Sequence, residues 1–553
     1  MSPLEWEWGK ARMRIDRVQV SNHSRIRDLS LQFRTHAVIV GANDVGKTSL
    51  LRLLNLLFGC TTAQLFQRLS LDDLENLGTE LVVEARLMDF DDVDRRLFHR
   101  EISISEDDQS ESLRVQLAVG PDPADETAVM IRRWFPEGGH SAGPSRDQLA
   151  RFGWRYLPAT RAATAGSFDG PNSALQSLLQ AIDLGEQETE LVGLMSSFND
   201  RLDKVGTIDQ LRGDVASHLS RAMPRSVDKD ELAVRTSIDP AADVLGAVSM
   251  FFKRDEGLVP LSEQSDGLRQ LISMTLFDLA EGAANVVAID EPELHLHPAS
   301  QRTVADLFAK STNQKILVTH SPYMVQRFEP LHVIAVGPDG TCSQIADEKL
   351  DAVGKHLANW WSPRLLEALT ARFVILVEGA SDRVIVEAAA EQLGVHLDRL
   401  GAVVVDLDGA HKFPHVYKLI GKDGFKVKLL GLVDEAESAM WQGAIGGRPR
   451  DVFGSQLWVS APDLEAEYCG ALGGPGAARA LIASRMCSER TILQACNASD
   501  LDHVDPTAVA HYCRGDGRKV TAAVAIASQM TQSSAAAIAS VAGLLAELAR
   551  LGA

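Results

Sequence analysis

The sequence predicts an α/β protein built as two units, and three observations carry this prediction. A glycine-rich loop, Gly41–Thr48, lies between an apolar strand and an apolar helix. Two further apolar runs, Val286–Ile289 and Lys315–Val318, end in polar residues, as short buried strands do. After Arg372, strand-like and helix-like segments alternate. This alternation is typical of a small parallel sheet covered by helices.

Size and composition place the chain among ordinary globular proteins of several domains. A chain of 553 residues exceeds what one hydrophobic core supports, so two to four domains are expected. The chain is 45% hydrophobic and has no apolar run long enough to span a bilayer. Its first residues lack the pattern of a secretion signal. We therefore expect a cytoplasmic protein with no membrane partner.

The cysteine spacing and the net charge of the chain are compatible with many functions. The six cysteines form no Cys-x-x-Cys pair, so reduced and mostly buried thiols are expected. A net charge of −20 argues against a surface that is basic throughout. It leaves room for a local basic patch, and a local patch is all that binding to nucleic acid requires.

The loop Gly41–Thr48 has the residue types that bind nucleotide phosphates. The glycines let the backbone curl so that N–H groups and the helix N-terminus point at phosphate oxygens. Lys47 is placed to reach the β- and γ-phosphates, and Thr48 to ligate magnesium. A purely structural glycine turn is the alternative, and the flanking strand and helix argue against it. We expect ATP to contact Gly41, Asn43, Gly46, Lys47, Thr48 and Ser49.

Two strand ends downstream supply polar groups for such a nucleotide. Asp290 and Glu291 follow the run Val286–Ile289. Asp290 is expected to hold magnesium, whereas Glu291 can polarise the water that attacks the γ-phosphate. His320 follows the next strand, at the place of a γ-phosphate sensor. Ser265 and Gly267 lie in a turn that opens a helix, which is another potential anion site.

The phosphate loop, the serine-glycine turn, the acidic strand end and His320, in this order along the chain, resemble the ABC-type ATPases of the SMC, RecF and OLD families. In those families the serine-glycine signature of one subunit closes on the nucleotide held by its partner. The resemblance therefore implies at least a dimer, with Ser265 and Gly267 acting on the second subunit's nucleotide. The segment Tyr156–Arg161 also resembles the strand that OLD proteins place before their dimerisation helices.

A helical insert is predicted between the two ATPase parts. Leucines and other apolar residues recur at helical spacing from Ala174 to about Phe252. About 80 residues folded as two antiparallel helices would extend roughly 60 Å, so we expect a compact dimerisation module and no long coiled coil. The expected boundaries are 1–165 and 253–362 for the ATPase parts, 166–252 for the insert and 363–553 for the second unit.

The second unit begins with a strand that ends in acids. Glu378 follows the run Phe373–Val377, and Asp382 lies four residues later, where a helix starts. The two carboxylates could share a cation, although helix capping alone also explains them. Asp434 ends a later strand. Because the carboxyl ends of parallel strands meet at one crevice, Glu378 and Asp434 are candidates for one metal site.

This unit resembles the Toprim domain of topoisomerases, primases and OLD nucleases. Glu378 and Gly379 match its first motif, and Asp434 matches the first acid of its Asp-x-Asp motif. Ala436 occupies the place of the second aspartate, so Glu435 or Glu437 must substitute for it if two metals bind. A rival Asp-x-Asp pair begins at Asp406, and we rank Asp434 above it.

OLD nucleases also carry an acidic segment and a lysine late in this domain. The segments Asp463–Glu465 and Arg518–Ala523 are similar to these. The resemblance gives Lys519 the role of stabilising charge on the cleaved phosphodiester, and an ordinary exposed lysine is the alternative. Beyond Lys519 we expect one Ala- and Leu-rich helix up to Leu551, packed on the sheet.

The resemblance to the OLD family covers nearly the whole chain. It implies an ATP-dependent endonuclease that uses Mg²⁺ or Mn²⁺ to cut DNA, with Glu378, Asp382, Asp434 and Glu435 or Glu437 as metal ligands. Similarity to the nuclease subunit of the Gabija antiphage system suggests defence against phage and a helicase-like partner. A DNA-binding scaffold with an inactive Toprim domain remains the alternative. A primase is disfavoured, because no zinc-binding cysteine set is present.

Overall fold

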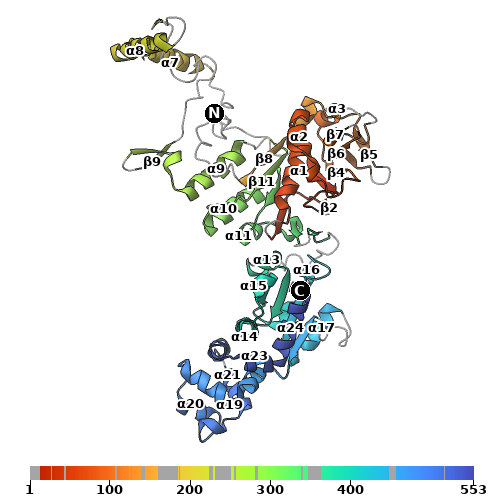
Figure 1. The fold of residues 1–553 in the computed structure, drawn as a ribbon, viewed down its shortest axis with the longest axis vertical. Helices are drawn as coiled ribbons and strands as arrows, with labels where there is room; N and C mark the ends of the chain where they lie inside the picture. Colours follow the sequence, from red (N-terminus) through yellow and green to blue (C-terminus); the bar gives the residue numbers. More distant parts are fainter. Residues whose placement is uncertain are drawn as a thin grey trace.

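The structure is a computed structural model of the chain. It describes residues 13–159, 187–222, 251–280, 284–346, 363–446 and 456–552, together with residues 185, 228 and 230. Within these ranges, residues 27, 43–44, 106–108, 124, 139–142, 203, 255–256, 338–339 and 516 are not described. The head, residues 13–346, lies above the second unit in Figure 1, and helices α7 and α8 stand beyond the head on the opposite side.

The first layer of the head is an antiparallel sheet with the strand order β2-β1-β4-β6-β5, and β7 also pairs with β6. Alternation of apolar and polar residues along β4 buries every second side chain. The buried face packs on α1 (Lys47–Gly59). The strands are β1 (Arg14–Ser21), β2 (Leu29–Gln32), β4 (Leu81–Met88), β5 (Ile102–Ile104), β6 (Glu111–Asp122) and β7 (Asp125–Trp134). Short helices on this side are α2 (Thr62–Arg68), α3 (Asp92–Leu97) and α4 (Arg146–Arg151).

The second layer is the sheet that carries the nucleotide motifs, in the order β14-β13-β3-β12-β11-β8. All of its neighbouring strands are parallel except the β13 and β14 pair. Its strands β3, β11, β12 and β13 are buried along their whole length, as expected of a sheet covered on both faces. The strands are β3 (Ala37–Gly41), β8 (Trp154–Leu157), β11 (Val286–Asp290), β12 (Gln314–Val318), β13 (Val333–Val336) and β14 (Cys342–Ser343).

Helix α1 lies between the two sheets, and the opposite face of the parallel sheet contacts α10 (Pro298–Ala309) and α11 (Pro322–Val325). Helix α9 (Asp266–Ala280) packs beside α10, after the hairpin β9 (Phe251–Arg254) and β10 (Gly257–Pro260). The parallel sheet therefore brings the ends of β3, β11 and β12 to one edge, and these are the strands that precede the predicted nucleotide residues.

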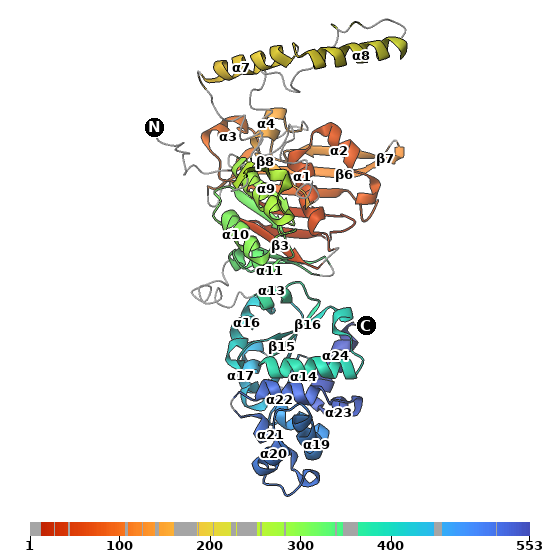
Figure 2. The ribbon, with the colours of Figure 1, turned by 90° about the vertical axis from the view of Figure 1, so that its left-hand side faces the viewer.

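The insert is helical where the structure describes it, as the spacing of its apolar residues predicts. Of this segment the structure describes α7 (Gln187–Leu202) and α8 (Gly206–Ala222), and the helix expected near residues 174–182 lies outside the described residues. Figure 2 shows α7 and α8 end to end, away from the sheets. Leu194, Phe198 and Leu211 are more than half exposed there. Within the described residues, α7 and α8 thus present apolar side chains to solvent.

The second unit has a four-stranded sheet that is parallel throughout, in the order β16-β15-β17-β18. The predicted strand at residues 373–377 coincides with β15 (Phe373–Val377), and the helix-like segments expected after Arg372 include α16 (Phe413–Ile420). The other strands are β16 (Ala402–Asp406), β17 (Leu429–Asp434) and β18 (Leu457–Ser460). Its helices include α14 (Ala380–Gln392), α15 (Leu397–Leu400), α17 (Glu435–Ile445), α19 (Leu464–Ala483), α20 (Glu489–Ala495) and α21 (Pro506–Cys513).

The single C-terminal helix predicted beyond Lys519 is wrong. The chain forms α22 (Lys519–Ala527), α23 (Gln532–Ala537) and α24 (Ala539–Gly552) instead. The break before α23 has a local cause: the side chain of Thr531 accepts from the Ser534 N–H, and the Ser534 hydroxyl accepts from the Thr531 N–H. Such a capping box starts a new helix. As expected, the last helix, α24, packs on β17 and β18.

Helix α13 (Pro363–Ala368) joins the two units through a common core. Leu365, Leu366 and Leu369 belong to one apolar cluster that includes Met324 of α11 and Leu376 of β15. The head and the second unit therefore share buried apolar surface at α13. No helix in the described part of the chain is long and apolar enough to cross a bilayer.

Candidate active sites

Two glycines of the phosphate loop lie where a larger residue would not fit. Gly46 has φ +93°, and a Cβ there would approach the Arg25 carbonyl oxygen to 2.9 Å, so a larger residue would be strained and crowded. A Cβ on Gly41 would lie 2.5 Å from the Val336 carbonyl oxygen. Lys47 is buried, and its Nζ donates to the Ala42 carbonyl at 2.5 Å. Asn43 lies outside the described residues. Ser49 lies in the first turn of α1.

Thr48 and Asp290 meet across the loop and the end of β11. The Thr48 hydroxyl donates to Asp290 Oδ1 at 3.3 Å. Burial, with a smaller effect of the neighbouring Glu291 carboxylate, raises the pKa of Asp290 to about 6. A hydroxyl and a carboxylate beside a phosphate loop form the pair of oxygen ligands that magnesium takes in such sites.

Glu291 and His320 face each other across the ends of β11 and β12. The distance between His320 Nε2 and Glu291 Oε1 is 3.8 Å. Burial lowers the pKa of His320, and the nearby Lys47 ammonium lowers it further. Glu291 has φ +49°. This unusual backbone turns its side chain away from the direction that an extended strand would give it.

Glu293 is a residue that the sequence analysis missed. Its Oε1 accepts from the His320 N–H at 2.6 Å, and burial raises its pKa. Its Oε2 has no hydrogen-bond partner among the described residues. Glu293 thus fixes the backbone of His320. The acidic run after Asp290 was visible in the sequence, although nothing in it distinguished this structural role.

The serine-glycine turn opens a helix, as predicted. Ser265 precedes α9, is exposed, and accepts from the Arg269 N–H at 2.9 Å through its carbonyl oxygen. A Cβ on Gly267 would lie 3.1 Å from the His295 carbonyl oxygen, so α9 passes close to the segment after β11. Its exposed N-terminus is free to contact a molecule outside the chain.

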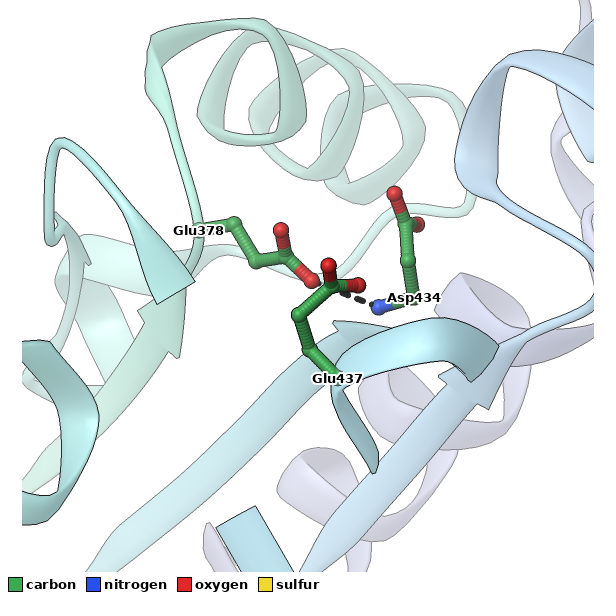
Figure 3. Close-up of side chains that lie close together, drawn as sticks. All are labelled: Glu378, Asp434 and Glu437. Atoms are coloured by element: carbon green, nitrogen blue, oxygen red, sulfur yellow. Dashed lines mark hydrogen bonds between the residues drawn. The ribbon is translucent and has the colours of Figure 1, made fainter. Parts of the chain in front are cut away.

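Three carboxylates of the second unit form a cluster at the carboxyl ends of its strands. Glu378 follows β15, Asp434 ends β17, and Glu437 lies in the first turn of α17. One oxygen from each lies within 4.8 Å of the others, and Figure 3 shows the three side chains converging. The Asp434 N–H donates to Glu378 Oε1 at 2.8 Å. This backbone bond locks the two strand ends together and orients Glu378.

The electrostatics of this carboxylate cluster favour a cation. Burial and, to a smaller extent, nearby carboxylates together raise the pKa of Glu378 to about 7 and that of Asp434 to about 8. Crowded, partly buried carboxylates resist ionisation because their charges repel one another. A hard divalent cation takes oxygen ligands and relieves this repulsion, so the donor set fits magnesium or manganese chemistry.

Asp382 serves as the cap that its sequence position allowed. Its Oδ2 accepts from the Gly379 N–H at 3.0 Å, which caps α14. Its carboxylate is not among the three that converge, and burial, with a smaller effect of the Glu465 carboxylate, raises its pKa to about 6. Asp382 in turn raises the pKa of both Glu378 and Asp434. It therefore acts electrostatically on the carboxylate cluster while serving as a cap.

Of the two glutamates offered as substitutes at the second motif acid, only Glu437 lies in the carboxylate cluster. Glu435, one residue after Asp434, is exposed. The spacing explains the difference, since residues i and i+3 of a helical turn share a face and i+1 does not. The rival pair follows β16, beside β15, and is not among the three converging carboxylates: Asp406 contacts Arg383 at 3.8 Å, and Asp408 pairs with Lys412 at 3.0 Å.

Lys519 pairs with a buried glutamate beside the carboxylate cluster. Its Nζ lies 3.2 Å from Glu465 Oε1, and Glu465 is 2% exposed. Burial alone would lower the pKa of Lys519, and the carboxylates of Glu465, Asp434 and Asp382 outweigh it and raise the pKa. The sequence analysis singled out the segment around Glu465 and did not assign Glu465 itself to the site.

Comparisons with known protein families agree with this two-unit organisation. The family described as "Overcoming lysogenization defect protein-like, TOPRIM domain" matches residues 369–435. An AAA ATPase domain family matches residues 13–114, and the family "AAA domain, putative AbiEii toxin, Type IV TA system" matches residues 139–326. The match to the Toprim domain falls on the unit with the carboxylate cluster. The matches to the AAA domains fall on the unit with the phosphate loop.

Curated relatives share the same organisation. The OLD nuclease of Thermus scotoductus is 24% identical over 425 residues, which cover 71% of this chain and 77% of the relative. The Endonuclease GajA of Bacillus cereus is 24% identical over 200 residues, about a third of each chain. The Old nuclease of Escherichia phage P2 is 26% identical over 214 residues, again about a third of each.

Among solved structures, the C-terminal region of the Burkholderia pseudomallei OLD protein aligns with 33% of this chain and 99% of its own, at 23% identity and a TM-score of 0.28. The Smc head domain from Pyrococcus furiosus aligns with 62% of this chain and 99% of its own, at 14% identity and a TM-score of 0.36.

The chain thus belongs to the class of proteins that join an ABC-type ATPase head to a Toprim domain, and such domains use a nucleotide and divalent metal. Within that class, the matching Toprim family and the curated relatives support an ATPase–Toprim nuclease similar to those of the OLD family.

Proposed function

We propose that this protein is an ATP-binding and ATP-hydrolysing endonuclease that cuts or nicks DNA with Mg²⁺ or Mn²⁺. The observation that carries the proposal is the convergence of Glu378, Asp434 and Glu437 at the carboxyl ends of β15 and β17. Nuclease relatives of the same domain organisation support the substrate class. The similarity to Endonuclease GajA supports a role in defence against phage, with a helicase-like partner as one possibility that the neighbouring reading frame would test.

In this proposal Glu378, Asp434 and Glu437 hold the metal, and Asp382 tunes their charge. The bound metal would activate water and stabilise the oxygen that leaves. Glu378 is oriented by the backbone of Asp434, so the strand ends hold the ligands before the metal arrives. Lys519, half exposed and close to the carboxylates, would stabilise negative charge on the phosphodiester.

The head would bind ATP and magnesium through Gly41, Asn43, Gly46, Lys47, Thr48, Ser49 and Asp290. Glu291 would orient the attacking water, and His320 would contact the γ-phosphate. The exposed turn at Ser265 and Gly267 would complete the nucleotide site of a second copy, so we propose a homodimer or a larger homo-oligomer. The exposed apolar residues of α7 and α8 support the same assembly.

ATP would control the nuclease through α13. A cavity of about 360 Å³ is lined on the head side by Thr319, His320 and Tyr323, and on the other side by Leu366 and Glu367 of α13 and by Thr370. His320 thus borders both the predicted γ-phosphate position and the helix that leads into β15. A movement of His320 on binding ATP would change the packing of α13.

The test is a nicking assay with supercoiled plasmid, ATP, and Mg²⁺ or Mn²⁺. We expect the wild-type protein to nick the plasmid, and Glu378→Ala and Glu437→Ala to lower the rate by about 100-fold or more, since each removes a metal ligand. Glu435→Ala is the matched control and should retain most of the activity. Intact supercoils with every metal, together with normal ATP hydrolysis, would instead indicate a nucleotide-switched DNA-binding scaffold.

A further inference from the structure

A groove lies at the amino end of the Toprim sheet, away from the carboxylate cluster. Its volume is about 520 Å³, and its lining includes Phe373, Tyr417, Lys422, Lys426 and Lys428. Phe373 begins β15, and Lys428 immediately precedes β17. We call this feature the basic groove. Helix α16 and the C-terminal end of α24, which border it, lie at the end of the unit that faces the head (Figures 1 and 2).

The basic groove concentrates positive charge in an acidic protein. Five of the fifteen lysines of the chain fall within residues 412–428, a stretch that has one acid, Asp423, whereas the whole chain has a net charge of −20. Lys418, Lys422, Lys426 and Lys428 are all exposed, and Arg372 lies beside them, also exposed. Such a local reversal of charge is the electrostatic signature of a surface that binds a polyanion.

Among the described residues, no ion pair joins Lys418, Lys422, Lys426 or Lys428 to a carboxylate. Glu547, the acid in the lining of the groove, pairs with Arg550 at 2.5 Å. The lysines of the groove therefore keep their full charge available for an external anion.

Local contacts hold part of the groove in place. Lys422 Nζ donates to the Ile445 carbonyl at 3.1 Å. Lys428 Nζ lies 5.7 Å from the centre of the Phe373 ring, and the Arg372 guanidinium lies 5.2 Å from the same ring. Cation–π contacts of this kind restrict both side chains. Two of the positive charges thus lie beside the buried ring of Phe373, the first residue of β15.

The groove and the carboxylate cluster lie at opposite ends of the same strands. β15 has five residues, so Phe373 and Glu378 are separated by roughly 17 Å along the strand at about 3.3 Å per residue. Along one strand of B-DNA this distance corresponds to about five nucleotides, at about 3.4 Å each. The groove therefore cannot contact the phosphodiester that is cut, and can contact phosphates a few nucleotides away.

We propose that the basic groove binds the phosphate backbone of the DNA substrate outside the cleavage site, and so sets the path of the DNA between the head and the metal centre. The substrate class rests on the function proposed above. The groove contacts phosphates and no bases, so its contribution is independent of sequence and sensitive to salt.

The test is DNA binding measured by fluorescence anisotropy with a labelled 40-base-pair duplex, in Ca²⁺ so that no cutting is required. The variant is Lys426→Glu combined with Lys428→Glu. We expect its dissociation constant to rise at least about tenfold, and the slope of log K against log salt to fall by about 2, because two phosphate contacts are lost. The melting temperature is measured in parallel to verify the fold.

The matched control is Arg485→Glu combined with Arg490→Glu. Both arginines are exposed in the helical part of the same unit and distant from the groove, and the charge change is identical. Equal weakening by both pairs would mean that net charge alone is responsible and would overturn the proposal. Unchanged binding by the groove variant would do so as well.

The outcome is separable from that of the nuclease assay. A wild-type protein that binds duplex through the groove and never nicks it would contradict the proposed function and leave the groove in place. A wild-type protein that nicks DNA, together with a groove variant that binds DNA like the wild type, would support the proposed function and overturn the proposal for the groove.

Discussion

At the scale of single residues, the carboxylate cluster is a set of acids that resist losing their protons. The pKa values of Glu378, Asp382 and Asp434 are raised to about 7, 6 and 8, mainly by burial. Without metal, the folded protein therefore holds protons that the unfolded chain releases near pH 4. Between about pH 4 and pH 8 the cluster's contribution to stability falls as the pH rises, because the folded state binds more protons than the unfolded state.

A pH dependence of metal binding follows from this. Metal must displace these protons, so we expect the rise in melting temperature on adding Mg²⁺ or Mn²⁺, without nucleotide, to be small at pH 6 and to increase up to about pH 8.5. Thermal unfolding followed by fluorescence measures this rise in melting temperature at each pH. Asp434→Asn removes the group with the highest pKa and should flatten the curve. An equal metal effect at pH 6 and pH 8.5 would contradict the proton-occupied cluster.

At the scale of elements, the contact between α19 and α22 gives Lys519 two roles that must be told apart, one structural and one catalytic. Glu465 near the start of α19 is buried and pairs with Lys519, the first residue of α22. Removing the lysine would leave a buried charge without a partner. The same substitution would remove a cation near the carboxylates, so one variant alone cannot distinguish the two roles.

The distinction requires a double variant. We expect Lys519→Ala to destabilise the protein by about 1–3 kcal/mol and to impair nicking, since a buried partner is left unsatisfied. Adding Glu465→Gln should restore the melting temperature, because a neutral amide needs no cation. Nicking should stay low in the double variant if Lys519 acts on the phosphodiester. Full recovery of both properties would show that Lys519 serves only to balance Glu465.

Elements with strong local signals could be predicted from the sequence, and those that depend on distant contacts could not. The buried strand β15 and helix α16 followed from apolar runs with clear ends. The division of the C-terminal helix depended on two side chains, Thr531 and Ser534, capping each other's backbone. The choice of Glu437 over Glu435 depended on the phase of α17, which the sequence left open. Glu293 and Glu465 were missed because their partners lie far along the chain.

At the scale of the whole molecule, the exposed turn before α9 is the feature on which the proposed assembly rests. Ser265 is exposed, and α7 and α8 present apolar residues to solvent. Both features fit a symmetric assembly in which the same surfaces meet twice. A nucleotide between two heads would then be contacted by the phosphate loop of one chain and by the signature turn of the other.

Mixing two inactive variants tests this arrangement. Lys47→Ala removes the phosphate-binding ammonium, and Ser265→Arg blocks the signature turn, so we expect neither variant to hydrolyse ATP alone. After mixing and subunit exchange, mixed dimers contain one intact composite site, and up to about a quarter of the wild-type ATPase rate should return. Failure of any activity to return, despite exchange verified with labelled subunits, would place Ser265 in the site of its own chain.

The orientation of β15 also bears on how one chain keeps two hydrolytic reactions apart. β15 begins after α13 on the side of the head, and Glu378 lies at its far end. The leucines of α13 belong to the apolar cluster that the head shares with the Toprim sheet. The proposed metal site therefore lies at the end of β15 that points away from the head. ATP also contains phosphate bonds, and this separation would keep the ATP bound in the head away from the metal that is proposed to cut DNA.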